Sequence, residues 1–162
     1  MAFRTERYLV TAGRVALVAT ALAFVAPVEA GGPYSFYSLA PCRVVDTRNP
    51  TGPTGGPSLG ANTTRSFPIL GACGVPATAQ AVVFNVTIAA PTDLGDIRIY
   101  PAGTTMPLAS VINWVASDSA VANGAIIPVG SDAGNHVSIR VDMVPTSTGQ
   151  VDLILDVTGY FE

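Results

Sequence analysis

The chain has 162 residues, of which 49% are hydrophobic and 12% are charged. Its basic residues are eight arginines without any lysine, its acidic residues number eleven, and the formal net charge is −3 at pH 7. A surface that binds nucleic acid needs clustered basic side chains to neutralise phosphates, and anionic membranes attract proteins through similar clusters. The composition therefore argues against a nucleic-acid partner and against electrostatic membrane binding.

Residues 1–30 have the pattern of a cleaved secretory signal peptide. Three arginines precede the apolar run 15–28, and small residues flank Glu29 just before Gly31. The run is shorter than the roughly 20 residues that span a bilayer. We therefore expect secretion of a mature chain, residues 31–162, with five arginines, nine acidic residues and no transmembrane anchor. A chain of this length is expected to fold as a single domain.

Cys42 lies in the stretch APCRVVDTR, residues 40–48, beside arginine and aspartate residues that would suit a reactive thiol. A catalytic thiolate needs a nearby base, however, and no motif places His136, the single histidine, next to it. An exported chain enters an oxidising compartment, where two cysteines allow one pairing. We therefore predict a structural disulfide between Cys42 and Cys73.

Short apolar segments separated by glycine and proline follow one another along the mature chain. The expected strands, in chain order, are 36–40, 42–47, 66–70, 80–90, 96–101, 109–115, 123–129, 136–143 and 150–161. The stretch 47–64 is rich in glycine and proline and is expected to be a surface loop. No stretch after residue 31 shows a convincing helical period. The prediction is an all-β protein, an antiparallel β-sandwich or jelly roll of about eight or nine strands.

Strict alternation in two of these segments predicts which side chains are buried. Segment 80–90 places alternate residues from Val82 to Ile88 on one face, and the last segment does the same from Val151 to Val157. Two sheets that each bury such a face against the other would form the core.

Several segments together have a wider likeness. PCRVVDTR, CGVP and LILDVTGYF, with IYPAG and ANGAIIPVG between them, resemble a module common in secreted and surface proteins of environmental bacteria. In that family the module occurs alone behind a signal peptide or beside other extracellular modules, and the resemblance covers residues 36–162. It implies an extracellular setting and a β fold, and it implies no particular chemistry.

No catalytic residues are predicted. A serine triad needs a histidine, but no G-x-S-x-G elbow accompanies His136, which is expected to be exposed at a strand end. A glycosidase needs two carboxylates roughly 5 to 10 Å apart, whereas Asp152 and Asp156 on one strand are about 13 Å apart by strand rise. Asp46 or Asp142 could complete a pair across strands, but any protein with this many acidic residues permits such a pair.

No metal or other cofactor is predicted. Zinc lacks a ligand set, because one histidine and a bonded cysteine pair do not provide one. Calcium is left open at the loops 92–96 and 131–135, which offer several oxygen atoms, although both loops read more simply as hairpin turns.

The five arginines of the mature chain lie in or near expected strands. Planar guanidinium groups in such positions bridge carboxylates, for which Asp46, Asp142 and Asp156 are candidates. We expect fixed ion pairs rather than substrate recognition.

The preferred function is a secreted, non-catalytic structural or surface module. Its first segment, 31–40, carries Tyr34, Phe36 and Tyr37, and it is expected to form the first strand of its own sheet. Alternatively, this segment adds to the exposed edge of a neighbouring copy or of another extracellular protein. Such head-to-tail contacts would build a filament or a surface layer.

Carbohydrate binding is the alternative function. Exposed aromatic side chains could stack on the sugar rings of a polysaccharide, and Tyr100, Trp114 and Tyr160 are the candidates. Tyr100 and Trp114 lie within expected strands, however, where aromatic residues more often contribute to the core.

Overall fold

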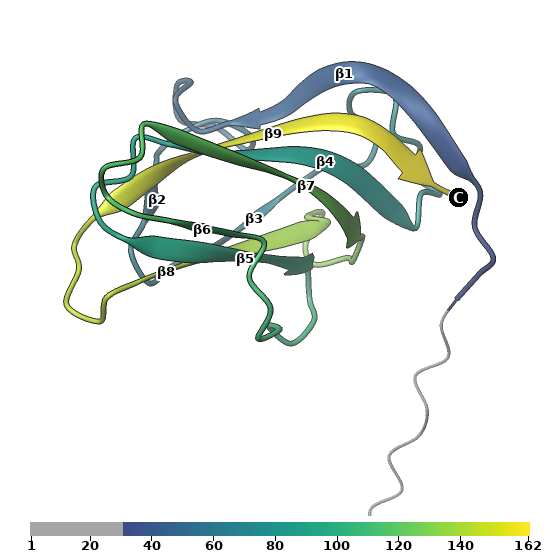
Figure 1. Cartoon of the computed structure of the whole chain (residues 1–162). Helices are drawn as coiled ribbons and strands as arrows, with labels where there is room; N and C mark the ends of the chain where they lie inside the picture. The colour runs from purple at the N-terminus through teal and green to yellow at the C-terminus, as the bar shows by residue number, and fades with distance from the viewer. Residues whose placement is uncertain (1–30) are drawn as a thin grey trace, which may run out of the picture. The chain divides into compact units, whose positions relative to one another are not determined.

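Nine β-strands make up the regular structure of residues 31–162, which the computed structural model describes (Figure 1). The expected signal peptide, residues 1–30, lies outside the described residues. In chain order the strands are β1 (Phe36–Asp46), β2 (Leu59–Gly60), β3 (Thr64–Phe67), β4 (Ala81–Ala89), β5 (Gly95–Pro101), β6 (Ile112–Trp114), β7 (Ala120–Pro128), β8 (Val137–Met143) and β9 (Gln150–Phe161).

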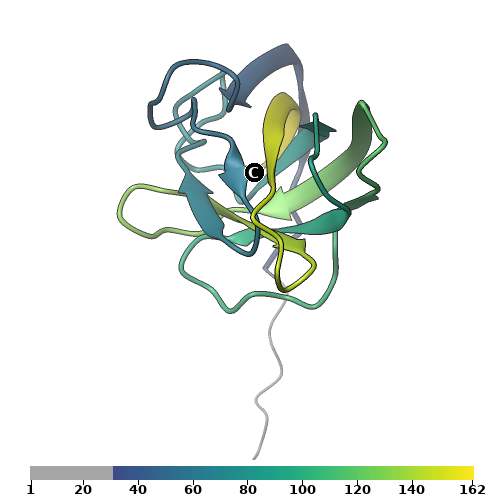
Figure 2. The same cartoon turned by 90° about the vertical axis from the view of Figure 1, so that its left-hand side faces the viewer.

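The strands form two antiparallel sheets that pack face to face (Figure 1, Figure 2). The five-stranded sheet has the order β1-β9-β4-β7, with β2 also paired to β9. The four-stranded sheet has the order β3-β8-β5-β6. This arrangement confirms the predicted all-β sandwich, and it makes β1 and β7 the edge strands of the five-stranded sheet.

The core lies between the sheets and follows the predicted alternation. Val82, Phe84, Val86 and Ile88 of β4 are each at most 1% exposed. Other fully buried side chains of the two facing layers are Val45, Phe67, Ile97, Val137, Ile139, Val141, Val151, Leu153, Leu155 and Val157. Each large apolar side chain buried in this way stabilises the fold by roughly 1.5–3 kcal/mol.

Several element boundaries differ from the prediction; β7, for example, begins at Ala120, three residues before the expected segment 123–129. The segments 36–40 and 42–47 belong to one continuous strand, β1, because two register shifts against β9 absorb the extra residues. The expected loop 47–64 contains the short strand β2. Strand β3 ends at Phe67, where Pro68 has no N–H to continue the ladder.

Two loops that were predicted as hairpin turns instead cross between the sheets. Loop 92–96 leads from β4 to β5, and loop 131–135 lies between β7 and β8, so each connects strands of different sheets. Within the second loop the backbone of Asp132 and Asn135 still forms a tight turn through two hydrogen bonds. Turn residues report local backbone geometry and not the sheet that the next strand joins, so the topology was beyond this prediction.

The predicted disulfide between Cys42 and Cys73 is present, with the two Cα atoms 5.6 Å apart. Cys42 lies in β1, and Cys73 lies in the loop between β3 and β4. The two residues are 31 positions apart, so the bond joins the edge of the five-stranded sheet to the connection that leaves the four-stranded sheet.

Candidate functional sites

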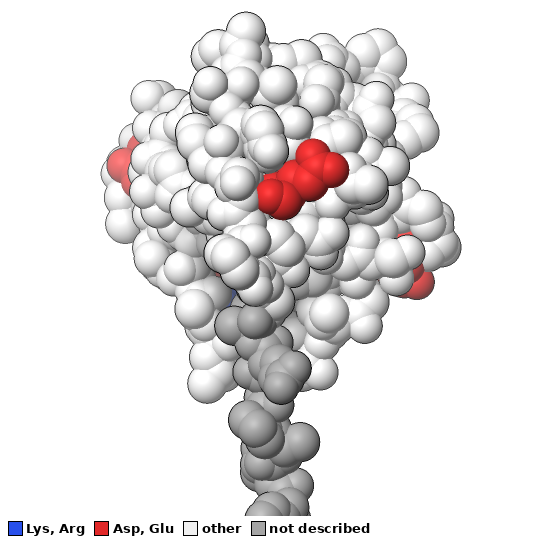
Figure 3. Space-filling model, turned by 90° about the vertical axis from the view of Figure 1, so that its right-hand side faces the viewer, with Lys and Arg blue, Asp and Glu red and all other residues white. Residues whose placement is uncertain are grey.

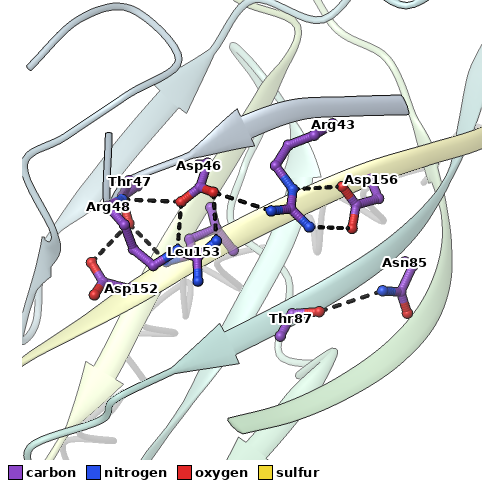
Figure 4. A network of polar contacts seen from close by, with 9 residues as sticks. All are labelled: Arg43, Asp46, Thr47, Arg48, Asn85, Thr87, Asp152, Leu153 and Asp156. Carbon is purple, nitrogen blue, oxygen red and sulfur yellow. Dashed lines mark hydrogen bonds and ion pairs between the residues drawn. The ribbon is translucent and has the colours of Figure 1, made fainter. Parts of the chain in front are cut away.

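An arginine–aspartate cluster lies on the outer face of the five-stranded sheet, where β1 meets β9 (Figure 4). Arg43 is opposite Asp156 and donates to its carboxylate from Nε at 2.9 Å and from Nη2 at 3.2 Å. Nη1 of Arg43 also donates to Asp46 at 3.3 Å. Arg48 holds the same Asp46 carboxylate from Nε at 2.8 Å and from Nη2 at 2.7 Å. The four side chains form a continuous series of ion pairs.

The ion pairs of this cluster favour the charged forms of Arg43, Asp46 and Arg48. Asp46 is only 6% exposed, and the side-chain hydrogen bond from Arg48 holds its pKa at about 2, below the usual value of 3.8. The hydrogen bond to Asp156 raises the pKa of Arg43, and the hydrogen bond to Asp46 raises the pKa of Arg48. In neutral solution Arg43, Asp46 and Arg48 therefore stay charged, and none of the three is poised to take up or release a proton.

Hydroxyl groups next to the cluster fasten the β1–β2 loop to β9. The buried Thr47 hydroxyl donates to Oδ1 of Asp152 at 3.1 Å and accepts the backbone N–H of Leu153 at 2.8 Å. The Ser58 hydroxyl donates to the same oxygen of Asp152 at 2.6 Å. Together with the ion pairs, these contacts make the VDTR stretch a structural connection between β1 and β9.

A second charged cluster lies on the outer face of the four-stranded sheet. Asp96 of β5 is directly opposite Asp142 of β8, and Nε of Arg98 lies 3.7 Å from the first carboxylate and 3.4 Å from the second. Nε of Arg140 donates to the other oxygen of Asp142 at 2.9 Å. Burial, reinforced by the charge of Asp142, raises the pKa of Asp96. Arg98 thus lies between the two carboxylates and Arg140 pairs with Asp142, which confirms the expected ion pairs of these arginines.

Arg65 behaves differently from the other four arginines of the described residues. Its guanidinium donates to the carbonyl oxygens of Pro57 at 3.0 Å and Gly52 at 2.7 Å, and it lies 4.6 Å from the centre of the Phe67 ring. It therefore fixes the β1–β2 loop over β3 and forms no ion pair. Burial lowers the pKa of this guanidinium.

Two adjoining hollows lie where the loops at one end of the sandwich meet. The first, of about 430 Å³, borders the second charged cluster and includes Trp114 and Val144. The second, of about 490 Å³, is lined mainly by hydroxyl groups of Thr92, Thr146, Ser147 and Thr148. These hollows offer hydrogen-bonding groups but no nucleophile that is paired with a base.

The loops left open for calcium use several of their oxygens within the protein. Oδ1 of Asp93 accepts the backbone N–H of Leu94 at 2.8 Å, and the Asp93 carbonyl accepts Nε1 of Trp114 at 2.8 Å. Across residues 31–162, no group of three or more histidine, cysteine, aspartate or glutamate side chains is placed to hold a metal ion. Among residues 31–162, these loops therefore contribute no cluster of three carboxylates.

His136 lies at a strand end, directly before β8, as predicted, but the prediction that its side chain is exposed is wrong. The side chain is half-buried, and its Nδ1 accepts the backbone N–H groups of Ile69 at 2.9 Å and Leu70 at 3.2 Å. Burial lowers its pKa, which favours the neutral ring that these hydrogen bonds require. His136 thus organises the turn after β3.

The aromatic residues of the carbohydrate alternative do not form a common exposed surface. Tyr100 is 9% exposed and Trp114 is 5% exposed, and both belong to the four-stranded sheet. Tyr160 belongs to the five-stranded sheet, where its ring stacks on Tyr37 with centroids 5.1 Å apart. The expectation that Tyr100 and Trp114 lie in the core is therefore the one that the structure supports.

The aromatic residues proposed for assembly are exposed, but two of them already have partners within the chain. Tyr34, Phe36 and Tyr37 are 44%, 53% and 46% exposed. Phe36 pairs with Phe161, and Tyr37 pairs with Tyr160, in the β1–β9 register. The segment therefore forms the first strand of its own sheet, as the preferred expectation had it. Figure 3 shows that the side of the molecule on which the C terminus lies is mostly uncharged, with isolated acidic patches.

Edge strand β7 is a surface feature that the sequence reasoning missed. It pairs with β4 at every residue from Ala120 to Pro128 without a register shift, and none of the strands of residues 31–162 pairs with its other side. It contains no charged residue, and the nearest charges along the chain are Asp118 and Asp132. Natural edge strands are usually protected by lysine, proline, bulges or short length. The charge-free interval in the sequence was the signal that could have revealed this edge.

Comparisons with known proteins add no family, because no family model, no curated protein and no solved structure matches the chain. Within residues 31–162 there is no helix that is long and apolar enough to cross a membrane.

Proposed function

We propose that the chain is a secreted, non-catalytic structural or surface module that associates by sheet extension. In sheet extension, an edge strand of one copy pairs with a sheet edge of another copy. The observation that carries this proposal is β7, a regular edge strand of nine residues without any charge. Such an edge is a template for another strand because its outward backbone groups lack partners.

The hydrogen bonds that flank β7 indicate which backbone groups face outward. Ala90 donates its N–H to Ser119, and Val129 donates its N–H to Gln80. At both ends of the β4–β7 ladder, the odd-numbered residues on the β7 side are therefore the ones that hydrogen-bond to the β4 side. In an antiparallel ladder the intervening alternate residues point their backbone groups away from the partner strand. Those residues are Ala120, Ala122, Gly124, Ile126 and Pro128, and all five are exposed.

The remaining sheet edges are less suitable for pairing. Strand β3 has four residues and β6 has three, which is too short for an extended ladder. Strand β1 is longer, but it contains two register shifts and Pro41, and its Asp46 N–H already donates to the Thr54 carbonyl. Bulges, proline and covering loops are the features that protect natural edges. Strand β7 has no register shift against β4, and no proline precedes its terminal Pro128.

Support for an extracellular setting comes from the disulfide and from the N-terminal sequence pattern. Disulfides persist in oxidising compartments and are rare in reducing ones. The Cys42–Cys73 bond closes a loop within the sandwich, and the chain leaves no free cysteine among the described residues. The resemblance to bacterial surface modules points to the same setting.

Sheet extension is tested on residues 31–162, which contain all nine strands and the disulfide. We expect sedimentation velocity over a concentration series to show reversible association of this protein. An Ala122→Lys variant places a charge on the edge and should remain a single copy. An Asn85→Lys variant, with the charge on exposed interior strand β4, is the matched control and should associate as the parent does. A parent protein that stays a single copy at every concentration would overturn the proposal.

A further inference from the structure

We propose that the partner of β7 is β7 of a second copy, paired antiparallel about a two-fold axis at Asn123–Gly124. This inference rests on the proposed function and specifies its interface. The product is a closed dimer in which the two five-stranded sheets form one continuous sheet. It replaces the head-to-tail filament of the sequence-based expectation, because an isologous contact closes on itself.

The outward backbone groups of β7 are self-complementary about this centre. With the axis at Asn123, Ala120 faces Ile126 of the other copy, and Ala122 faces Gly124. Each of these outward residues then exchanges its N–H and C=O with an outward residue of the other strand. Moving the axis along the strand to the next residue, Gly124, also supplies every outward N–H with a carbonyl.

Side-chain sizes on the outer face fit the same pairing. Ile126 is 59% exposed and is the large outward side chain near one end of β7. In the antiparallel dimer it lies opposite Ala120 or Ala122 of the other copy, so a large side chain meets a small one. A side-chain carbon added to Gly124, at the centre, would meet no atom within 4 Å, so nothing in its own chain crowds the axis.

The absence of charge along residues 119–131 also fits self-pairing. A two-fold axis brings each residue near the centre close to its own copy. Like charges that face each other across strands destabilise the pairing, so a single lysine or aspartate near the axis would oppose it. If β7 paired with β1 instead, a charge on β7 would not have to face its own copy. It could face an opposite charge, because β1 carries Arg43 and Asp46 near its C-terminal end.

The β1 edge also offers too little regular backbone for the competing head-to-tail contact. Ser35 and Glu162 exchange two backbone hydrogen bonds at the start of the β1–β9 ladder. Because hydrogen-bonded and non-hydrogen-bonded pairs alternate in an antiparallel ladder, the backbone groups of Phe36 and Ser38 point away from β9. The first register shift follows Ser38, and Pro41 lies within it. The edge of β1 therefore accepts a short ladder, whereas β7 accepts one along its whole length.

The size of the contact predicts a reversible dimer. Stable interfaces bury roughly 800 Å² on each partner, and one strand edge supplies less than that. The dimer should therefore be populated at high protein concentration, as on a crowded surface, and should dissociate on dilution.

Thiol cross-linking tests the geometry of the dimer. Ala122→Cys and Gly124→Cys variants of residues 31–162, each alone and both mixed, are oxidised at a concentration where the parent associates. We expect a covalent dimer from Gly124→Cys alone or from the mixture, with the β7–β7 link identified by peptide mass spectrometry. Either link supports the two-fold pairing. A link formed by Gly124→Cys alone indicates an axis at Gly124, whereas a link between positions 122 and 124 in the mixture indicates an axis at Asn123.

The competing geometry is tested in parallel by mixing Gly124→Cys with Ser38→Cys, which carries its thiol on the outward edge of β1. A β7–β1 link in this mixture, without β7–β7 links, would overturn the two-fold dimer while leaving sheet extension intact. Association that persists in Ala122→Lys and gives none of these links would overturn both the dimer and the role of β7. A parent that never associates would overturn the proposed function itself.

Discussion

The hydroxyl of Thr47 accepts the backbone N–H of Leu153 at 2.8 Å, while the backbone N–H of Thr47 donates to the Leu153 carbonyl at 3.0 Å. A side chain thus supplies the acceptor that a ladder carbonyl would otherwise supply at the end of β1. Both residues are buried, with exposed fractions of 3% and 0%. The hydroxyl is the hydrogen-bond acceptor for the Leu153 N–H among residues 31–162.

We therefore predict that Thr47→Val destabilises the protein. Valine has nearly the same shape but cannot accept the Leu153 N–H, and an unsatisfied buried donor costs about 1–3 kcal/mol. Thr47→Ser keeps the hydroxyl and serves as the matched control. Urea unfolding of both variants measures the difference, and equal stabilities would show that the Leu153 hydrogen bond contributes nothing.

Because the pKa of Asp46 is lowered in the folded protein, we predict that the protein loses stability in acid. The pKa of Asp46 is about 2 in the folded protein, below the ordinary value of 3.8 that applies to the unfolded chain, so the unfolded chain binds the proton first as the pH falls. The stabilisation is complete above pH 4 and is lost as the pH falls towards 2, with a total of roughly 2 kcal/mol from a shift of this size. Asp46→Asn should be less stable than the parent at pH 7 and should lose less between pH 4 and pH 2.

Chemical denaturation at several pH values measures this difference. Asp132→Asn, at an exposed loop position, is the control and should follow the parent curve. If Asp46→Asn loses as much stability as the parent between pH 4 and pH 2, the ion pairs around Asp46 do not account for the loss of stability in acid.

Some of these relationships were readable from the sequence, and others were not. The alternation in β4 and β9 predicted the buried faces correctly, because a strand turns every second side chain to the same face. The pairing of arginines with Asp46, Asp142 and Asp156 was also expected, since planar guanidinium groups in or near strands bridge carboxylates. Such features depend on residue type and on neighbours along the chain.

The missed features depend on contacts between distant segments. The hydrogen bonds to His136 come from Ile69 and Leu70, nearly 70 positions away, and nothing near His136 in the sequence indicates them. The edge position of β7 likewise depends on which strands pair. Alternation along a strand indicates which side chains are buried, but it does not indicate which strand lies beside it. Loop crossings between the sheets were missed for the same reason.

His136 predicts a second pH dependence, closer to neutrality. Its pKa is lowered in the folded protein from 6.5, so the unfolded chain takes up the proton first on acidification. Stability from the neutral ring is therefore complete above pH 6.5 and declines as the pH falls below that value. His136→Ala should be less stable than the parent at pH 8 and should lose the parent's dependence on pH between 8 and 5.

The same interval can be checked at the ring itself by NMR titration. A His136 pKa below 6.5 is the expected result. A value above 6.5 would reverse the sign of the predicted slope and would contradict the role of neutral Nδ1 as acceptor for Ile69.

We predict that a side chain at position 95 causes a packing defect. A side-chain carbon at this position would overlap the backbone oxygen of Asp142 and would crowd the Trp114 ring. The oxygen belongs to neighbouring strand β8 and cannot move without displacing the ladder. Gly95→Ala should therefore destabilise the protein by about 1–3 kcal/mol. Gly124→Ala, where the added carbon meets no atom within 4 Å, is the control and should be nearly neutral in dilute solution.

The disulfide should contribute to stability but not to association. Removing a crosslink between residues 31 positions apart costs roughly 3 to 4 kcal/mol through the entropy of the unfolded chain. The Cys42→Ser, Cys73→Ser double variant should therefore unfold at lower urea concentration than the parent. Because Cys42 lies in β1, across the five-stranded sheet from β7, the folded double variant should still form the β7 dimer. Loss of that dimer while circular dichroism shows an intact fold would place the interface near β1 instead.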